Sequence, residues 1–182
     1  MNKPDLEKAR AKWRHRGEAR PDVAIEPGPG QESVWDYPRP PAVVPDSRHV
    51  VARLGDHLLA DSHAPIRVLE TASPPVFYLP PKDVDFTLLQ PDEVHTFCEW
   101  KGRADYFHVQ LDGRIISHIA WSYPEPFDGF GEIKHYVSFY PEKCACFVDG
   151  ERVQAQGGGY YGGWVTAEIV GPFKGQTGTS SW

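Results

Sequence analysis

Proline and glycine restrict the fold of this chain more than any other feature of its sequence. There are 18 prolines and 17 glycines among 182 residues, together about a fifth of the chain and above the usual share. Proline removes a helical hydrogen bond and clashes with the preceding turn, so a helical bundle is excluded. Because 40% of the residues are hydrophobic and 13% are aromatic, the chain can still bury a core. We therefore expect many short strands joined by tight turns.

Gly-Asp and Asp-Gly pairs between apolar segments predict successive β-hairpins, because these pairs favour two-residue hairpin turns. We expect one hairpin around Gly55-Asp56 and another around Asp149-Gly150. Between them, residues 94–123 are expected to form a three-stranded meander whose second turn is Asp112-Gly113. A total of about eight to ten strands with almost no helix predicts an all-β fold, an antiparallel β-sandwich or a barrel of two small sheets.

Two neighbouring segments are interpreted from their prolines. The apolar runs 66–70 and 76–79 are expected to be strands separated by a turn at Pro74-Pro75, because proline is common in turns and rare inside strands. Residues 81–90 predict one helical turn with Asp83 as its N-cap, since a carboxylate at this position accepts a hydrogen bond from the backbone.

The chain divides by composition into three parts. Residues 1–32 hold a short basic helix, predicted over 4–16 with Gly17 as its stop, and a linker rich in proline and glycine. Residues 33–153 are expected to form the β domain. Residues 154–182 are a glycine-rich extension that we expect to pack on this domain and to fray at its end.

Charge is distributed unevenly between the N-terminal helix and the rest of the chain. Residues 1–20 hold seven Lys/Arg against three acids, a balance of +4, and the remaining residues hold twelve against twenty-two, a balance of −10. The body therefore repels nucleic acid, and only the basic helix could attract it or another acidic partner. We expect a monomer or a weak homodimer formed through an exposed strand edge.

The sequence gives no signal for a membrane or for export. It has no run of about twenty apolar residues, as a membrane span requires, and the N-terminal MNKPDLEKAR lacks the apolar stretch of a secretory signal. Three cysteines in such a chain favour free thiols in a reducing compartment. We therefore expect a cytoplasmic protein.

The setting of Cys98 depends on strand register, because a shift of one residue exchanges the two faces of a strand. An even loop around Gly102-Arg103 places Cys98 across from Phe107, on an apolar face. There it would be a small buried hydrophobe. An odd loop places Cys98 across from His108, which together with Lys101 would stabilise a thiolate, the nucleophilic form. The sequence leaves both arrangements open.

Several segments in a fixed order carry a resemblance to a known family. They are VWDYPRPP (34–41), LADS (59–62), VLETASPPVFYLPPKDV (68–84), TFCEWKGRADYFHV (96–109), AWSYPEP (120–126) and VSFYPEK (137–143). Over about residues 33–153 the chain resembles the DUF427 family, a domain of unknown function labelled nucleotidyltransferase-like. GGWVTAEIVGPFKG (162–175) is similar to a tail of longer members. The resemblance implies a β-tent-like fold of two antiparallel sheets around a pocket.

The resemblance also implies site residues by position. The residues that recur in the family fall on Glu70, Tyr78, Cys98, Lys101, Gly102, Tyr106, Trp121 and Tyr123. Where the family often has a proline after its cysteine, this chain has Glu99, which places a negative charge beside the thiol.

A nucleotidyltransferase-like enzyme is the alternative function that the family label implies, but the residues themselves support it weakly. It needs carboxylates that hold Mg²⁺ against phosphates, usually after a Gly-Ser turn. Asp83 and Asp85 are the candidate pair, but the chain has no Gly-Ser dipeptide, so we interpret them as a helix cap and a surface acid. The glycine run 157–164 lacks the spacing of a phosphate-binding loop. The label alone is therefore weak support.

No metal or cofactor is predicted either. Cys144 and Cys146 are too close in sequence for the usual zinc-binding pair, and Cys98 would have to add a third ligand. The eight histidines show no HxH or HxxxH spacing. We expect the cysteines to be structural.

Amphipathic aromatic residues predict a ligand pocket, because a fold of this size cannot bury all of them completely. Glu70 follows an apolar run, so its side chain would need a partner such as Lys101 or Arg39. A small molecule stacked on tryptophan and held by Glu70 and Lys101 would suit such a site. The candidate ligand-binding residues are Trp35, Arg39, Tyr78, Trp100, Tyr106, His108, Trp121 and Tyr123.

The pocket and the N-terminal helix together suggest functions from different classes. The first is a module that binds a small molecule or nucleotide without catalysis. The second is an enzyme with Cys98 or Lys101 as nucleophile. Glu70 or His108 would then carry the proton, and Tyr106 would orient the substrate. The third is a scaffold that docks a partner through the N-terminal helix.

Overall fold

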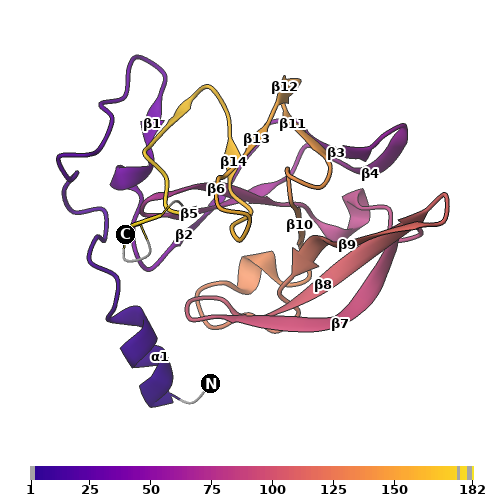
Figure 1. The fold of residues 1–182 in the computed structure, drawn as a ribbon, viewed down its shortest axis with the longest axis horizontal. Coiled ribbons are helices and arrows are strands. Elements are labelled where there is room, and N and C mark those ends of the chain that lie inside the picture. The colour runs from indigo at the N-terminus through magenta and orange to yellow at the C-terminus, as the bar shows by residue number, and fades with distance from the viewer. Residues whose placement is uncertain (1–2, 176, 180–181) are drawn as a thin grey trace.

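Two four-stranded antiparallel sheets form the centre of the fold (Figure 1). The computed structural model describes residues 3–175, 177–179 and 182. The first sheet is the meander, in the order β10-β9-β8-β7: β7 (Leu89–Cys98), β8 (Gly102–Leu111), β9 (Arg114–Ser122) and β10 (Val137–Phe139). The second sheet has the order β12-β11-β3-β4: β3 (Val50–Leu54), β4 (His57–Ser62), β11 (Ala145–Val148) and β12 (Glu151–Arg152).

A three-stranded sheet and two short strand pairs complete the β structure. The sheet has the order β2-β5-β6: β2 (Ala42–Pro45), β5 (Ile66–Glu70) and β6 (Ser73–Tyr78). The pairs are β1 (Glu32–Ser33) with β15 (Ile169–Val170), which are parallel, and β13 (Gln154–Ala155) with β14 (Trp164–Val165), which are antiparallel. An isolated bridge between Leu79 and Val137 connects the chain after β6 to β10 and so brings the three-stranded sheet beside the meander.

Helical structure in the described residues is limited to short segments. They are the α-helix α1 (Lys3–Arg10) and the 3₁₀ turns η1 (Val34–Asp36), η2 (Pro81–Asp83) and η3 (Gly131–Ile133). Figure 1 shows α1 below the sheets, connected to them by an irregular segment.

The main hydrophobic core lies between the two four-stranded sheets. Val50 of β3 faces Val109 and Ile119 of the meander, and all three side chains are fully buried. Trp164 from the C-terminal extension is buried in the same core, and its indole N–H donates to the carbonyl oxygen of Phe139 at 3.0 Å. The extension therefore supplies part of the core as well as part of the surface.

A second core lies between the three-stranded sheet and the end of the meander near Cys98. It is rich in aromatic residues, which include Tyr78, Trp100, Trp121 and Tyr123. Large rings leave gaps when they meet at different angles, so this is the part of the fold where a cavity can form.

The all-β prediction is confirmed, and none of the sheets in the described residues closes into a barrel. The expected hairpins are present. In the turns at Asp112-Gly113 and Asp149-Gly150 both residues have positive φ, as the tight turn that follows the twist of a hairpin requires.

The predicted turn at Pro74-Pro75 is wrong. Both prolines lie inside β6, and the turn is at Thr71-Ala72, where Ala72 has φ 65°. Strand β6 pairs with β5 on one side only, and the pairing register shifts opposite the two prolines, between Val68 and Glu70. Proline is tolerated in edge strands and at such bulges, where a ladder hydrogen bond is missing anyway.

Two helix predictions are also corrected. Helix α1 ends at Arg10 rather than near residue 16, and the chain then turns so that Trp13 contacts the body. Asp83 is the last residue of η2 rather than its N-cap, which is Pro80. The Asp83 carboxylate instead accepts a hydrogen bond from the Ser62 hydroxyl at 2.6 Å.

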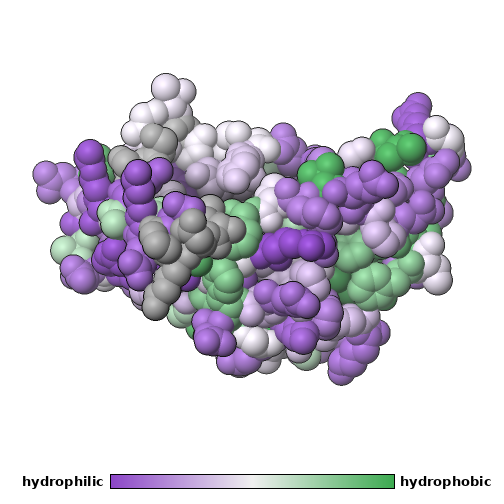
Figure 2. All heavy atoms as spheres, turned by 90° about the horizontal axis from the view of Figure 1, so that it is seen from below, coloured by the Kyte–Doolittle hydropathy of each residue, from purple (hydrophilic) through white to green (hydrophobic). Residues whose placement is uncertain are grey.

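No helix within the described residues is long and apolar enough to cross a membrane. Figure 2 shows that hydrophobic residues on one face form separate areas among hydrophilic ones.

Candidate functional site

A cavity of about 270 Å³ opens between the end of the meander, the three-stranded sheet and the C-terminal extension. Strand β5 contributes Glu70, β6 contributes Tyr78, and the β7–β8 hairpin contributes Cys98, Trp100 and Lys101. We call this space the cavity.

The β7–β8 turn determines which side chains face the cavity. Cys98 pairs with Gly102, so the loop is the three residues 99–101 and not a turn around Gly102-Arg103. Gly102 has φ 100°, a conformation that strongly favours glycine. This odd loop places Thr96, Cys98 and Tyr106 on the same face, and the Thr96 and Tyr106 hydroxyls are hydrogen-bonded at 2.7 Å. The odd loop and the shared face were therefore predicted correctly, but the predicted pairing of Cys98 with His108 is wrong, because Cys98 pairs with Gly102 and His108 with Gln90.

Glu70 is the centre of a buried ion cluster beside the cavity. Its Oε1 atom lies 3.0 Å from Nζ of Lys174 and 3.1 Å from a guanidinium nitrogen of Arg39. The Lys174 and Arg39 side chains are 5% and 0% exposed, and that of Glu70 is 14% exposed. Burial by itself would raise the pKa of the Glu70 carboxyl, but Lys174, Lys101 and Arg39 hold this pKa below its ordinary value. Glu70 is therefore an anion at neutral pH.

Lys101 is also buried, with 9% of its surface exposed, and it lines the cavity. Within the described part of the chain its ammonium has no hydrogen bond or ion pair, and its contact is the ring of Tyr123, with Nζ 5.8 Å from the centroid. Burial would lower the pKa of the Lys101 ammonium, but Cys98 and Tyr78 once ionised, and the carboxylate of Glu70, raise it above its ordinary value. Lys101 therefore keeps its proton at neutral pH.

Aromatic side chains form much of the cavity wall. The indole N–H of Trp121 donates to the Tyr78 hydroxyl at 3.2 Å, with the two rings edge to face. Burial raises the pKa of Tyr78 to about 12, and burial also raises the pKa of Tyr123 and Tyr140. These phenols remain neutral at physiological pH and can donate hydrogen bonds.

The N-terminal segment closes one side of the cavity. The indole N–H of Trp13 donates to Oε1 of Glu99 at 2.5 Å. The Trp13 ring has two cations over it, Arg39 at 4.5 Å and Lys174 at 4.4 Å from its centroid. Nε of Arg10 donates to the Glu99 carbonyl at 2.8 Å. The basic segment therefore docks on the body of its own chain.

The glycine-rich run 157–164 forms another wall. Tyr160 and Tyr161 line the cavity. A Cβ atom at Gly162 would collide with the indole of Trp121, and one at Gly163 would collide with Gln156. Glycine at these positions lets the backbone approach Trp121 of the meander and Gln156 closely, which explains the glycine-rich composition of the run.

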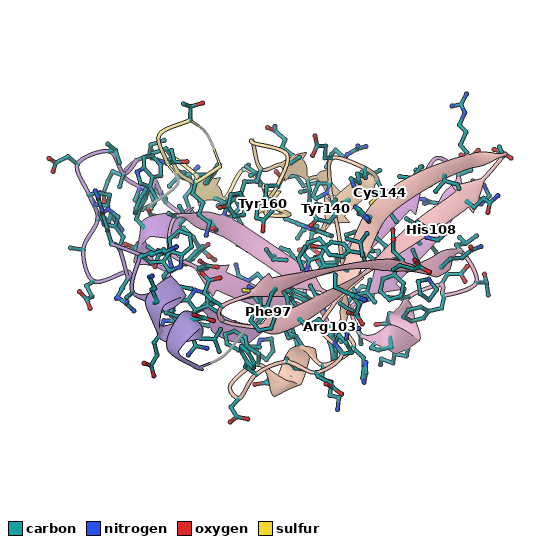
Figure 3. All side chains as sticks on the ribbon, turned by 60° about the horizontal axis from the view of Figure 1, so that its bottom comes forward. Phe97, Arg103, His108, Tyr140, Cys144 and Tyr160 are labelled. Atoms are coloured by element: carbon teal, nitrogen blue, oxygen red, sulfur yellow. The ribbon has the colours of Figure 1, made fainter. Side chains whose placement is uncertain are left out.

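The structure brings most of the predicted site residues together. The cavity is lined by Glu70, Tyr78, Cys98, Trp100, Lys101, Tyr106, Trp121 and Tyr123. Arg39 lies behind Glu70 and is absent from the lining. Trp35 is fully buried in a separate cluster, between His15 and Trp182. His108 pairs with Gln90 along the meander, and Figure 3 shows it far along the strand from Phe97 and Tyr160, which line the cavity.

Sequence reasoning missed several contributors that lie outside the β domain, among them Trp13, Lys174 and the tyrosine pair 160–161. The aromatic residues inside a glycine run were a usable signal, because aromatic residues in an irregular segment often anchor it. Nothing in the sequence pairs Lys174 with Glu70, which is 104 residues away.

The other candidate motifs lie outside the cavity. Asp83 and Asp85 are not among its lining residues, and Asp85 accepts hydrogen bonds from the hydroxyl and backbone of Thr87. The Sγ atoms of Cys144 and Cys146 are 3.8 Å apart in the main core. Burial raises the pKa of the Cys146 thiol well above its ordinary value, so this thiol is protonated.

Comparison with known proteins gives one family match. A family model described as a domain of unknown function, DUF427, and named NTP_transf_9 matches residues 42–154. No curated protein matches the chain significantly. The matched region contains the β7–β8 hairpin and Glu70, but the wall residues Trp13, Tyr160, Tyr161 and Lys174 lie outside it. Because the match covers more than half of the chain, the protein belongs to the DUF427 family.

Proposed function

We propose that this protein binds a small molecule that carries a planar ring and a single anionic group, with the ring against the aromatic wall and the anion beside Lys101. The observation that carries the proposal is Lys101, which is buried, lines the cavity, and has an ammonium over the Tyr123 ring without a hydrogen bond or ion pair among the described residues. A buried charge is costly unless it is paired, so this ammonium is suited to pair with a ligand.

The charge balance around the cavity supports a single negative charge on the ligand. Lys101, Lys174, Glu70 and Glu99 line the cavity, and Arg39 pairs with Glu70 from behind, so these five side chains together leave +1. Lys174 and Arg39 already bind Glu70. Lys101 is therefore the cation left over for a ligand.

Further groups in the cavity favour a ligand with a ring and polar edges. Trp100 and Ser73 line the cavity, and the Trp100 indole N–H and the Ser73 hydroxyl are buried without a hydrogen-bond partner in the described structure. Buried polar groups normally have hydrogen-bond partners, so a hydrogen-bond acceptor on the ligand would supply the missing partner. Stacking on Trp121 would bind the ring with an edge-to-face or offset geometry.

Nucleotidyl transfer, which the family name suggests, is supported less well. A nucleoside triphosphate needs carboxylates free to hold a metal ion. Glu70 is occupied by Lys174 and Arg39, and Glu99 by Trp13. One surplus positive charge also suits a single carboxylate or a monoanionic phosphate ester better than a triphosphate.

Catalysis by Cys98 is a second candidate function. Its thiol is partly exposed, lines the cavity, and interacts electrostatically with the Lys101 cation. Lys101 itself keeps its proton, so we assign it to anion binding rather than to nucleophilic attack.

A thermal-shift screen tests the binding function. The panel would contain planar aromatic carboxylates, nucleoside monophosphates, and neutral analogues of the same rings. A ligand at about 100 times its Kd stabilises the folded protein by about 2.7 kcal/mol. We expect anionic ring compounds to raise Tm, and Lys101→Met to remove the shift while the exposed Lys82→Met, which is the matched control, retains it.

The screen also separates the two candidate functions. Cys98→Ser should leave the Tm shift intact under both, but it should abolish turnover of the bound compound if the thiol is a nucleophile. If no compound of the panel raises Tm, or if Tm rises equally in Lys101→Met, binding at the Lys101 ammonium is refuted.

A further inference from the structure

The β3–β4 hairpin carries two histidines and an aspartate whose side chains meet on its outer surface. They are His49, Asp61 and His63. None of them lines the cavity or belongs to a hydrophobic core. We propose that these three residues form a binding site for a divalent first-row transition metal ion such as Zn²⁺.

Strand register explains why the three side chains converge. Val50 pairs with Ser62 and Val51 with Asp61, so in the same register His49 lies opposite His63. Val50 and Ser62 are buried. Because successive side chains of a strand point to opposite faces, His49, Asp61 and His63 share the outer face. The backbone of the hairpin therefore fixes the arrangement.

The distances are close to those of a metal site. Nε2 of His49 is 2.7 Å from Oδ1 of Asp61. The rings of His49 and His63 are stacked, with centroids 4.3 Å apart and planes at 11°. One ligand atom from each of the three residues lies within 4.8 Å of the others. Donor atoms that lie about 2.0–2.1 Å from a tetrahedral ion are about 3.3 Å apart. Side-chain rotations that move these ligand atoms by about 1–2 Å therefore complete the site.

The side chains have the freedom to make this adjustment. That of Asp61 is 47% exposed and that of His49 is 38% exposed, and His63 is also exposed. The main chain beside His49 is held in place, because its backbone N–H donates to the Asp149 carboxylate at 2.9 Å. A rigid backbone with movable side chains suits a site that forms when metal arrives.

The donor set determines the class of ion. Two imidazole nitrogens and one carboxylate oxygen suit Zn²⁺, Cu²⁺, Ni²⁺ and Fe²⁺, whereas Mg²⁺ and Ca²⁺ prefer oxygen ligands alone. Three protein ligands leave at least one coordination position for water or for a donor from another molecule. The site is therefore open rather than closed.

Sequence reasoning expected no metal because the histidines lack HxH or HxxxH spacing. The only local signal is Asp61-x-His63, in which two ligands sit on one face of a strand. His49 is fourteen residues before His63 in sequence and is brought opposite it by the hairpin alone.

Calorimetric titration of the metal-free full-length protein with ZnCl₂ tests the proposal. We expect one ion per chain. Loss of an outer-shell contact alone weakens metal binding about 10–100-fold, so loss of a direct ligand in His63→Ala or Asp61→Asn should weaken it at least as much. His57→Ala is the matched control, because His57 is exposed on the same hairpin and outside the cluster, and it should bind like the wild type.

A second measurement uses Co²⁺ in place of Zn²⁺ to distinguish binding by thiols from binding by nitrogen and oxygen donors. Co²⁺ bound to nitrogen and oxygen donors gives no thiolate-to-metal charge-transfer absorption, whereas binding at Cys144 and Cys146 would give it. The proposal is overturned if titration shows no saturable binding, if binding persists in His63→Ala, or if the cobalt complex shows thiolate absorption.

Discussion

Replacing Glu70 by glutamine tests whether the buried ion cluster beside the cavity stabilises the fold. The Glu70 carboxylate binds Lys174 at 3.0 Å and Arg39 at 3.1 Å. Glutamine has nearly the same shape but carries no charge. The Glu70→Gln variant therefore leaves the two partner cations buried without a counter-charge, and Lys101 lies nearby with the same sign.

The expected loss is large because the partners cannot reach water. The side chains of Arg39 and Lys174 are only 0% and 5% exposed. Removing one partner of a buried ion pair costs about 3–5 kcal/mol, a considerable part of the 5–15 kcal/mol that typically stabilises a domain. For a chain of this size about 2–4 °C of Tm corresponds to each kcal/mol, so Tm should fall by about 6–20 °C.

Urea unfolding followed by tryptophan fluorescence measures this loss. The matched control is Glu26→Gln, since Glu26 pairs with Arg20 at the shorter distance of 2.6 Å but its side chain is 84% exposed. An exposed pair contributes about 0–1 kcal/mol. A loss below about 1 kcal/mol in Glu70→Gln, or losses of equal size in both variants, would refute the reasoning that burial decides the contribution.

The stability difference between wild type and Glu70→Gln should also depend on pH. The pKa of the Glu70 carboxyl is lowered in the folded protein, because Lys174, Lys101 and Arg39 outweigh the effect of burial. The stabilisation is therefore fully present above the ordinary Glu value of 4.5 and is lost as the pH falls through the lowered pKa. The difference in unfolding free energy between wild type and Glu70→Gln should be constant near neutral pH and should shrink below about pH 4.5.

Three further predictions concern the segments around the cavity. Trp13→Ala should speed limited proteolysis of the linker before the β domain, because it removes the indole bond to the body; an unchanged cleavage rate would contradict this docking. Iodoacetamide should label Cys98 in the folded protein before Cys144 and Cys146, which are 6% and 0% exposed, as peptide mass spectrometry can show. Trp164→Ala should cost about 3–5 kcal/mol in urea unfolding, because its side chain is fully buried in the main core.

The hairpins could be predicted from the sequence because their information is local. Asp112-Gly113 and Asp149-Gly150 adopt the positive φ values that few other residue pairs allow. The turn before β6 could not be predicted in the same way, because prolines 74–75 signal a turn locally but lie in a strand with one open side. Whether a strand is at an edge is a property of the whole sheet, and no local rule contains it.

The candidate site could be predicted only in part, for the same physical reason. Cys98, Lys101 and Tyr106 come from one hairpin, so strand alternation and the family resemblance brought them together. His108 is two residues beyond Tyr106 but lies further along the strand and away from the cavity. Lys174 reaches Glu70 from a segment 104 residues away, and a contact of that range requires the folded chain.

The cavity is built partly by the region that the family model matches and partly by the segments before and after it. The family match contains Lys101 and Glu70, whereas Trp13 precedes the matched region and Lys174 follows it. Lys174 binds Glu70 and also lies over the Trp13 ring, so one carboxylate inside the domain holds both flanking segments against the cavity. The ammonium that would bind an anion belongs to the matched domain, and part of the wall that would select the ring belongs to the flanks. Under the proposed function, a chain with the same hairpin and other flanking residues would keep the Lys101 ammonium but would lose Lys174 and the flanking part of the cavity wall.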